Sequence, residues 1–369
     1  MAVIRDVLEG TLGILVAVVC IAIAAIAFVV DLTTRSHPTA GSAEVAVRDT
    51  TSILRNSAGF VHIVAKSDHD GLYAQGWAHA SDRLWQMEVL RRAARGTLSE
   101  ILGPDAVRTD LFMRSINLTA TARRLKASLS PVSRSILSSY VEGINGYIEA
   151  YPDKLPFEFD ALDARPAPWT IEDCLMVGRV VALQFSVGFW ADVAISQIAA
   201  QRGSDIAAMY IPQGLPYEPA VLDTFALPRL VPAQPVLVDS SMPPSAASVM
   251  LQVGHALRNV ASTLNITGSG RGSNAWAMSL GTEGAIVAND PHLPLALPST
   301  WYPVHITTPS YNVTGMSIPG LPLVLSGSND HIAWAVSSMM ADDVDYFIER
   351  VDRTNSGYYF NELGHRKRF

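Results

Sequence analysis

The sequence predicts an α+β fold, with helices in the first half of the chain and strands in the second. Apolar residues recur at helical spacing between residues 70 and 198, and they alternate with polar residues between residues 274 and 337. A run of helices followed by a run of strands is typical of α+β proteins, whereas α/β proteins alternate the two. The 369 residues suffice for a large core in one big domain or in two or three smaller ones.

An uncharged apolar run, Leu12–Val30, precedes all of these elements. A helix over this run is about 28 Å long at 1.5 Å per residue, close to the thickness of a bilayer core. No clear small-x-small cleavage site follows, so the run favours an uncleaved anchor over its alternative, a cleaved signal peptide. We therefore expect residues 1–35 to form a transmembrane anchor that contacts the membrane through residues 12–30.

Capping residues mark the expected helices. Asp70 and Ser130 stand at N-cap positions, and the proline after Ser130 is tolerated in the first helical turn. Thr97 and Thr170 each precede an acidic residue by three positions, which is the pattern of a capping box. The expected helices cover residues 71–95, 97–102, 131–151 and 170–198.

Short alternating runs predict the strands. Two of them lie within residues 45–64, around the turn Asn56–Gly59. A hairpin follows at residues 274–288, in which Gly281–Gly284 turns the chain, and residues 289–292 are expected to end the pairing. The remaining expected strands cover residues 301–306, 311–316, 321–325 and 332–337.

Composition excludes several classes of protein and site. The net charge of −7 without a basic cluster argues against nucleic acid as a partner. Two cysteines, Cys20 and Cys174, give neither a disulfide framework nor a cysteine metal site. The glycines before Ser273 match neither a phosphate loop nor a dinucleotide fingerprint, because the Lys and the spacing are missing. We therefore expect no organic cofactor.

Ser273 opens the hairpin directly after residues 204–272, a segment rich in Pro, Ser, Ala and Gly that we expect to be a linker or spacer. A Ser hydroxyl needs a base to act as a nucleophile. Cleavage of the Gly272–Ser273 bond would give Ser273 an α-amino group with a pKa of about 7.7–8.0, which takes up the hydroxyl proton at neutral pH. Gly272 suits self-cleavage because it has no Cβ to block attack on its carbonyl. The alternative is an ordinary loop-to-strand junction.

Four regions carry the signature of one family. The first is the hairpin, flanked by Gly-Ser-Asn-x-Trp at residues 272–276 and Asn-Asp-Pro-His-Leu at 289–293. The other three are residues 82–103, 156–173 and 326–351. Together they resemble the penicillin amidase family of N-terminal-nucleophile hydrolases. The resemblance implies an αββα sandwich, a chain that cuts itself before the nucleophile, and hydrolysis of a carboxylic amide by the new N-terminal Ser.

The resemblance also implies roles for individual residues. It makes Ser273 the nucleophile and base, places His292 in contact with it, and takes one oxyanion donor from the backbone N–H of Ser338. A second donor comes from an Asn side chain further downstream in the family. Taken alone, a His after Asp-Pro is typical of a turn.

A calcium site follows from the same resemblance. Asp342, the carbonyl of Val344 and Asp345 match the family's ligands, and Asp192 is the nearest match to its third carboxylate. Oxygen ligands suit Ca²⁺, although this set falls short of the usual six to eight. A solvated acidic loop without a metal is the alternative.

The family divides the chain into an α-chain region at residues 44–203, a spacer at 204–272 and the first part of a β-chain at 273–369. Family β-chains continue past the position of Phe369, so we expect an incomplete, C-terminally truncated sandwich, with a downstream β-chain fragment as a partner. Most members are exported, which implies bacterial-type export and a catalytic region held outside the cytoplasm by the anchor.

The expected function is that of an acylase precursor with a small acyl-amide substrate. Relatives with a His at the position of His292 act on cephalosporin-type or aliphatic acyl groups, so an acyl-homoserine-lactone or cephalosporin-type acylase is an alternative. A truncated, inactive and membrane-anchored relative is another. The third is a serine hydrolase that pairs Ser273 or Ser326 with His305 or His331.

Overall fold

The computed structural model describes residues 14–27, 29–30, 41–185, 188–210, 252, 255, 272–293, 295–338, 349–361 and 363–368. The chain divides into two compact units. Unit 1 comprises Met1–Val180 and Gly268–Ser337, and unit 2 comprises Val181–Thr267 and Ser338–Phe369. The expected α-chain, spacer and β-chain boundaries stay predictions. Most of the expected spacer, 204–272, lies outside the described residues.

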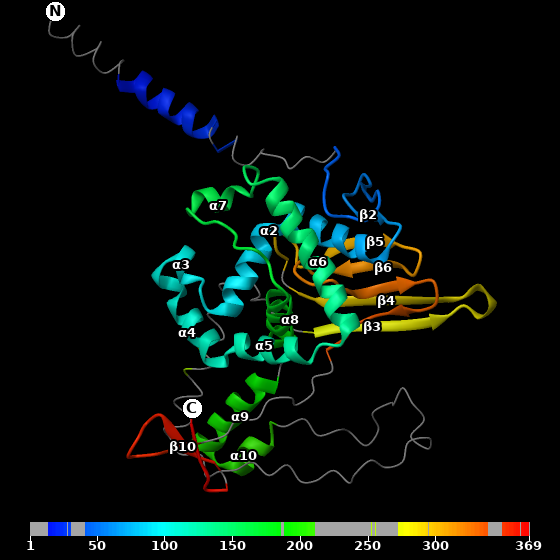
Figure 1. The fold of residues 1–369 in the computed structure, drawn as a ribbon. Coiled ribbons are helices and arrows are strands. Elements are labelled where there is room, and N and C mark those ends of the chain that lie inside the picture. The colour runs from blue at the N-terminus through cyan, green and yellow to red at the C-terminus, as the bar shows by residue number, and fades with distance from the viewer. Residues whose placement is uncertain are drawn as a thin grey trace, which may run out of the picture. The chain divides into compact units, whose positions relative to one another are not determined.

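Helices make up most of the first 185 residues, as the sequence predicts (Figure 1). Ser130 and Thr170 cap their helices as expected: Ser130 Oγ accepts from Ser133 N at 3.1 Å, and Thr170 Oγ1 accepts from Asp173 N at 3.3 Å. The helices are α2 (Asp68–Arg95), α3 (Ser99–Leu102), the 3₁₀ turn η1 (Pro104–Ala106), α4 (Val107–Ile116), α5 (Leu118–Ser128), α6 (Pro131–Ala150), α7 (Phe157–Ala161) and α8 (Ile171–Phe185).

Two of the expected caps are wrong. Helix α2 is capped by Ser67, whose Oγ accepts from Asp70 N at 3.1 Å, while the carboxylate of Asp70 accepts from the backbone of the preceding 48–49 segment. The capping box at Thr97 does not form. Instead Asp110, on the neighbouring helix α4, accepts from the backbone N–H groups of residues 98 and 99 at 2.8 Å each.

Helices α2 and α6 cross at two glycines. A Cβ on Gly76 would lie 2.0 Å from the carbonyl oxygen of Tyr140, and a Cβ on Gly143 would lie 1.9 Å from that of Tyr73. Each helix therefore presents a glycine to the backbone of the other. No larger side chain fits at either position without moving the helices apart.

Helix α2 covers one face of a six-stranded sheet with the order β1-β2-β5-β6-β7-β8. Strands β2 and β5 run parallel, and the other neighbours are antiparallel. The core on this face combines Ala74 and Ala78 of α2 with Val61, Val304 and other strand residues. The strands are β1 (Ser52–Arg55), β2 (Val61–Val64), β5 (Tyr302–Thr307), β6 (Asn312–Ser317), β7 (Val324–Asn329) and β8 (Ala333–Trp334).

The predicted hairpin forms a separate two-stranded sheet of β3 (Gly272–Ser279) and β4 (Ala285–His292). The expectation that residues 289–292 end the pairing is wrong, because β4 stays in register with β3 up to the pair Gly272–His292. Pro291 lies in this last stretch, at a strand end, where the absence of its N–H is tolerated.

Two charged residues of α2 contact the segments packed around it. Arg91 is 2% exposed, and its Nη1 donates to Ala167 O at 2.9 Å. Asp82 is exposed, and its Oδ2 accepts from Tyr302 Oη of β5 at 2.6 Å. These contacts join α2 to the segment before α8 and to the six-stranded sheet.

The described part of unit 2 includes helices α9 (Gly188–Arg202) and α10 (Ser204–Ala208) and a small sheet. The sheet has the order β11-β10-β9, from Arg366–Arg368, Tyr358–Phe360 and Arg350–Val351. Arg366 Nε lies 2.8 Å from Asp352 Oδ2 and so ties β11 to the turn that follows β9.

The expected transmembrane anchor is wrong. Among the described residues, none of the helices combines the length and the apolar character needed to cross a membrane. The membrane-anchored location expected from the apolar run at residues 12–30 is corrected with it.

Candidate active site

Ser273 is the second residue of β3 and lies opposite Pro291 of β4. Its side chain is half-buried. In the uncut chain the nitrogen of Ser273 belongs to a peptide bond, and its lone pair is delocalised into the carbonyl. That nitrogen becomes a base only if the bond from Gly272 is cut.

A second serine contacts Ser273. The Oγ atoms of Ser273 and Ser337 lie 3.2 Å apart, and Ser337 Oγ donates to the carbonyl oxygen of Ser273 at 3.3 Å. The sequence separates the two residues by 64 positions, and no local pattern predicts the contact. Ser337 therefore enters the candidate site only through the structure.

Asn289 fastens the hairpin to the segment that carries Ser337. Its Nδ2 donates to Val336 O at 2.8 Å and to Asn274 O at 3.0 Å, and its Oδ1 accepts from Val336 N at 3.1 Å. The amide side chain thus makes the pair of hydrogen bonds that a neighbouring strand would make to Val336. This arrangement holds the residue before Ser337 at a fixed distance from the strand that carries Ser273.

His292 lies beside the residues that flank Ser273. Its Nε2 is 3.0 Å from Asp290 Oδ2 and 3.2 Å from Asn274 Nδ2, and its Nδ1 is 3.3 Å from the place of a Cβ on Gly272. Side chains alternate between the faces of a strand, so the ladder puts His292 on the face of Gly272 and Asn274. The predicted contact between His292 and the nucleophile stays a prediction for the cut chain.

The other predicted residues belong to unit 2 or lie outside the described residues. Ser338 is half-buried and belongs to unit 2, as does Asp192 on α9, which is also half-buried. The calcium residues Asp342, Val344 and Asp345 lie outside the described residues. Within the described ranges, the structure has no group of three or more His, Cys, Asp or Glu that could hold a metal ion.

The residues of the alternative serine hydrolase have other contacts. Ser326 Oγ donates to Trp334 O at 3.4 Å. His305 uses both ring nitrogens, with Nδ1 at 3.1 Å from His62 Nδ1 and Nε2 at 2.7 Å from Asn312 Oδ1. These contacts give Ser326 and His305 structural roles in the six-stranded sheet, and they favour Ser273 as the nucleophile.

Comparison with known proteins matches the penicillin amidase family model to residues 50–368. The chain belongs to the penicillin amidase family. The predicted resemblance is thereby confirmed, and it extends over most of the chain, from before β1 to β11.

Named relatives include acylases of two kinds. The acyl-homoserine lactone acylase QuiP of Pseudomonas aeruginosa is 33% identical over 331 residues, which is 88% of this chain and 37% of that protein. The penicillin acylase 2 proenzyme of Pseudomonas sp. is 28% identical over 81% of this chain and 37% of its own length. The chain thus spans little more than a third of the length of these relatives.

Among solved structures, a thermostable penicillin G acylase from Alcaligenes faecalis is 30% identical. The aligned part covers 47% of this chain and 97% of that chain, with a TM-score of 0.40. Superposition at that score does not establish a shared fold. The mixed α+β character of this penicillin amidase family member rests on its own helices and sheets.

Proposed function

We propose that this chain carries the nucleophile of an acylase that hydrolyses a carboxylic amide through an N-terminal Ser273. The observation that carries the proposal is the position of Ser273 at the start of β3, with its hydroxyl against Ser337, in a chain that belongs to the penicillin amidase family. The names of the relatives, acyl-homoserine lactone acylase and penicillin acylase, support a reaction on acyl amides. The word proenzyme in one of those names supports processing of the chain.

The proposed reaction begins with self-cleavage of the Gly272–Ser273 bond. Ser273 Oγ attacks the carbonyl carbon of Gly272 and displaces the nitrogen of Ser273, and water hydrolyses the resulting ester to the free carboxylate of Gly272 and the free Ser273. The new α-amino group takes the proton from Ser273 Oγ, and the oxygen attacks the carbonyl carbon of the substrate amide. The tetrahedral intermediate then expels the amine, which receives the proton from the α-amino group, and an ester to Ser273 remains. Water attacks this ester with the same amine as base, so that a carboxylic acid leaves and Ser273 regains its proton.

The developing oxyanion needs positioned donors, each worth about 10²–10³ in rate. We assign one of them to the backbone N–H of Ser338, directly after the segment that Asn289 fastens to the hairpin. The completed site lies in an αββα sandwich of the N-terminal-nucleophile type. His292 would contact the nucleophile once the chain is cut and the new terminus moves.

Processing and hydrolysis are tested in one experiment on the Ser273→Ala chain. Intact-mass analysis and N-terminal sequencing of the unaltered chain are expected to show a fragment that begins Ser-Asn-Ala-Trp. The Ser273→Ala chain should remain whole and should not hydrolyse phenylacetyl- or long-acyl-anilides, because it lacks the hydroxyl. Ser279→Ala is the matched control, since it removes a hydroxyl from the other end of β3 and should be cut normally. Equal processing of both variants would contradict the assignment.

We also propose a structural Ca²⁺ bound by Asp342, the Val344 carbonyl and Asp345, with Asp192 as a further ligand. Carboxylate and carbonyl oxygens are the donors that calcium prefers. A metal bound only by the folded chain raises its stability by about 2.7 kcal/mol at a hundredfold excess over Kd. Thermal unfolding with calcium and with a chelator should therefore differ, and Asp345→Asn should shrink the difference. An unchanged difference in Asp345→Asn would rule out this ligand set.

A further inference from the structure

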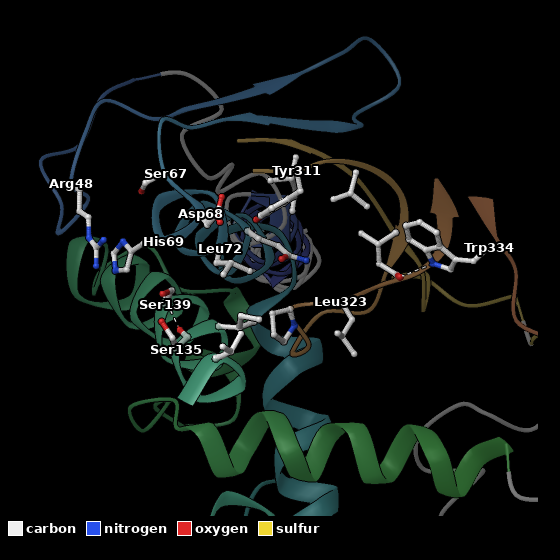
Figure 2. A pocket seen from close by; sticks show the side chains of 17 residues that line it. Arg48, Ser67, Asp68, His69, Leu72, Ser135, Ser139, Tyr311, Leu323 and Trp334 are labelled. Atoms are coloured by element: carbon white, nitrogen blue, oxygen red, sulfur yellow. Dashed lines mark hydrogen bonds between the residues drawn. The ribbon is translucent and has the colours of Figure 1, made fainter. Parts of the chain in front are cut away.

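A cavity of about 710 Å³ opens in unit 1 between helices α2 and α6 and strands β5 to β7 (Figure 2). Its size lies within the range of sites that bind small molecules. Neither Ser273 nor Ser337 is among its lining residues. The cavity is therefore separate from the candidate active site described above.

The walls of the cavity are largely apolar. Leu72 of α2 and Ile136 of α6 face strand residues such as Val313. Figure 2 shows Leu323 and Trp334 towards one side of the cavity and Arg48, Ser67 and His69 towards the other. A ligand that fits this distribution has an elongated apolar body.

Two buried polar groups among the lining residues lack hydrogen-bond partners. Gln75 is 1% exposed, and neither its Nε2 nor Tyr311 Oη has a partner within the described part of the chain. Tyr311 Oη lies 3.3 Å from the place of a Cβ on Gly71, one helical turn before Gln75, so both groups lie along the same face of α2. A buried donor without an acceptor costs about 1–3 kcal/mol, and a ligand oxygen would relieve that cost.

A carboxylate lies near one of the two unpartnered groups. Asp68 lines the cavity together with Arg48 and His69, and it is the one carboxylate among the lining residues. Burial, and after it the charge of Asp68, raises the pKa of Tyr311. A ligand anion at Tyr311 Oη would therefore be repelled by Asp68.

We propose that this cavity is a binding site for a neutral acyl compound, whose apolar chain lies along the wall and whose carbonyl oxygen accepts from Gln75 and Tyr311. The site is distinct from the proposed hydrolytic site and does not depend on cleavage before Ser273. Ligand binding there would fill the apolar volume and complete the two hydrogen bonds that the free protein leaves unmade.

The test measures binding of three probes of equal chain length to the Ser273→Ala chain, which removes any hydrolysis at Ser273. The neutral N-methyloctanamide is expected to bind and to change the fluorescence of Trp334, a change that Trp334→Phe removes. Octanoate is expected to bind at least tenfold more weakly, because its carboxylate at Tyr311 would lie near the negative charge of Asp68. Octylammonium should also bind more weakly than the amide, because it has no oxygen for Gln75 and Tyr311.

Two variants separate carbonyl recognition from simple filling of the cavity. Tyr311→Phe and Gln75→Leu should each weaken binding of N-methyloctanamide about fivefold, the effect of one hydrogen bond, and should leave the melting temperature of the free chain unchanged or higher. Tyr358→Phe, outside the cavity, is the matched control and should bind normally. Equal affinity for all three probes, unchanged affinity in both variants, or no binding would overturn the proposal. Failure of amide hydrolysis would leave these results unaffected.

Discussion

Replacing Arg91 with Met is expected to lower the free energy of unfolding by about 3–5 kcal/mol, the usual effect of breaking a buried ion pair from one side. Arg91 is 2% exposed and contacts Glu88, also 2% exposed, while its Nη1 lies 3.9 Å from Oδ2 of the fully buried Asp173. Its Nη1 donates to Ala167 O at 2.9 Å, and its guanidinium carbon lies 5.0 Å from the ring centre of Trp169. Removal of the cation leaves two buried carboxylates with less positive charge around them.

The cations that remain beside Glu88 and Asp173 decide where the loss in free energy of unfolding falls within that range. Arg92 Nε still lies 2.6 Å from Glu88 Oε1, and Arg95 Nη2 still lies 2.6 Å from Asp173 Oδ1. Both carboxylates therefore keep one cation, which favours the lower end, near 3 kcal/mol. Urea unfolding followed by circular dichroism measures the change.

An exposed arginine provides the control for Arg91. Arg124 on α5 contacts Thr121 at the surface, and Arg124→Met should change stability by no more than about 0.5 kcal/mol. The loss of stability in Arg91→Lys should lie between those of Arg91→Met and Arg124→Met, because lysine keeps the charge and lacks the planar set of donors. A change below 1 kcal/mol in Arg91→Met would contradict a structural role for the cluster.

Sequence patterns predicted the elements and caps that depend on residues close together in the chain. The order of helices and strands, the caps at Ser130 and Thr170 and the hairpin of β3 and β4 all follow from residues within a few positions of one another. Helices α4 and α5 were missed. The one local signal there is Asn117, which ends α4 at φ 56° and accepts from Ala120 N to start α5.

Contacts between distant residues were outside the reach of those patterns. Asp110 caps α3 from another helix. Gly76 and Gly143 allow α2 and α6 to cross closely, and the sequence of neither helix taken alone predicts that crossing. In the candidate site, the sequence alone pointed to Ser273 as a candidate nucleophile, which stays a prediction. The contact with Ser337 and the hydrogen bonds of Asn289 to Val336 needed the structure. The cavity next to α2 belongs to the same class, because the two lining groups without partners come from a helix and from the turn between two strands.

Acidification below pH 6.5 is expected to destabilise the chain through His79, a buried residue of α2. Its Nδ1 lies 2.6 Å from Tyr140 Oη and its Nε2 lies 3.0 Å from Ser317 Oγ. Ser317 Oγ donates to Tyr302 O at 2.8 Å, so it accepts from His79 Nε2–H, and Tyr140 donates to the unprotonated Nδ1. Gly320 N donates to Tyr140 Oη at 2.9 Å. This bond completes a series of hydrogen bonds that only the neutral imidazole of His79 can make.

Burial, and to a lesser extent the charge of Arg83, lowers the pKa of His79 to about 3. An unfolded His has a pKa of about 6.5, so between these values the unfolded chain binds a proton that the folded chain does not. The contribution of His79 to stability is therefore complete above pH 6.5 and decreases as the pH falls, by about 1.4 kcal/mol per pH unit. At pH 5 the loss is about 2 kcal/mol.

His79→Gln provides the test, because it removes the titrating group from the buried chain of hydrogen bonds. The free energy of unfolding, measured in urea from pH 7.5 to pH 5, should fall less steeply in His79→Gln than in the unaltered chain, whatever its stability at pH 7.5. His331→Gln is the matched control, since His331 is exposed and lies outside this buried series of hydrogen bonds. If His79→Gln kept the full slope, the loss on acidification would have to come from other groups, because the difference in slope depends only on protons bound at residue 79.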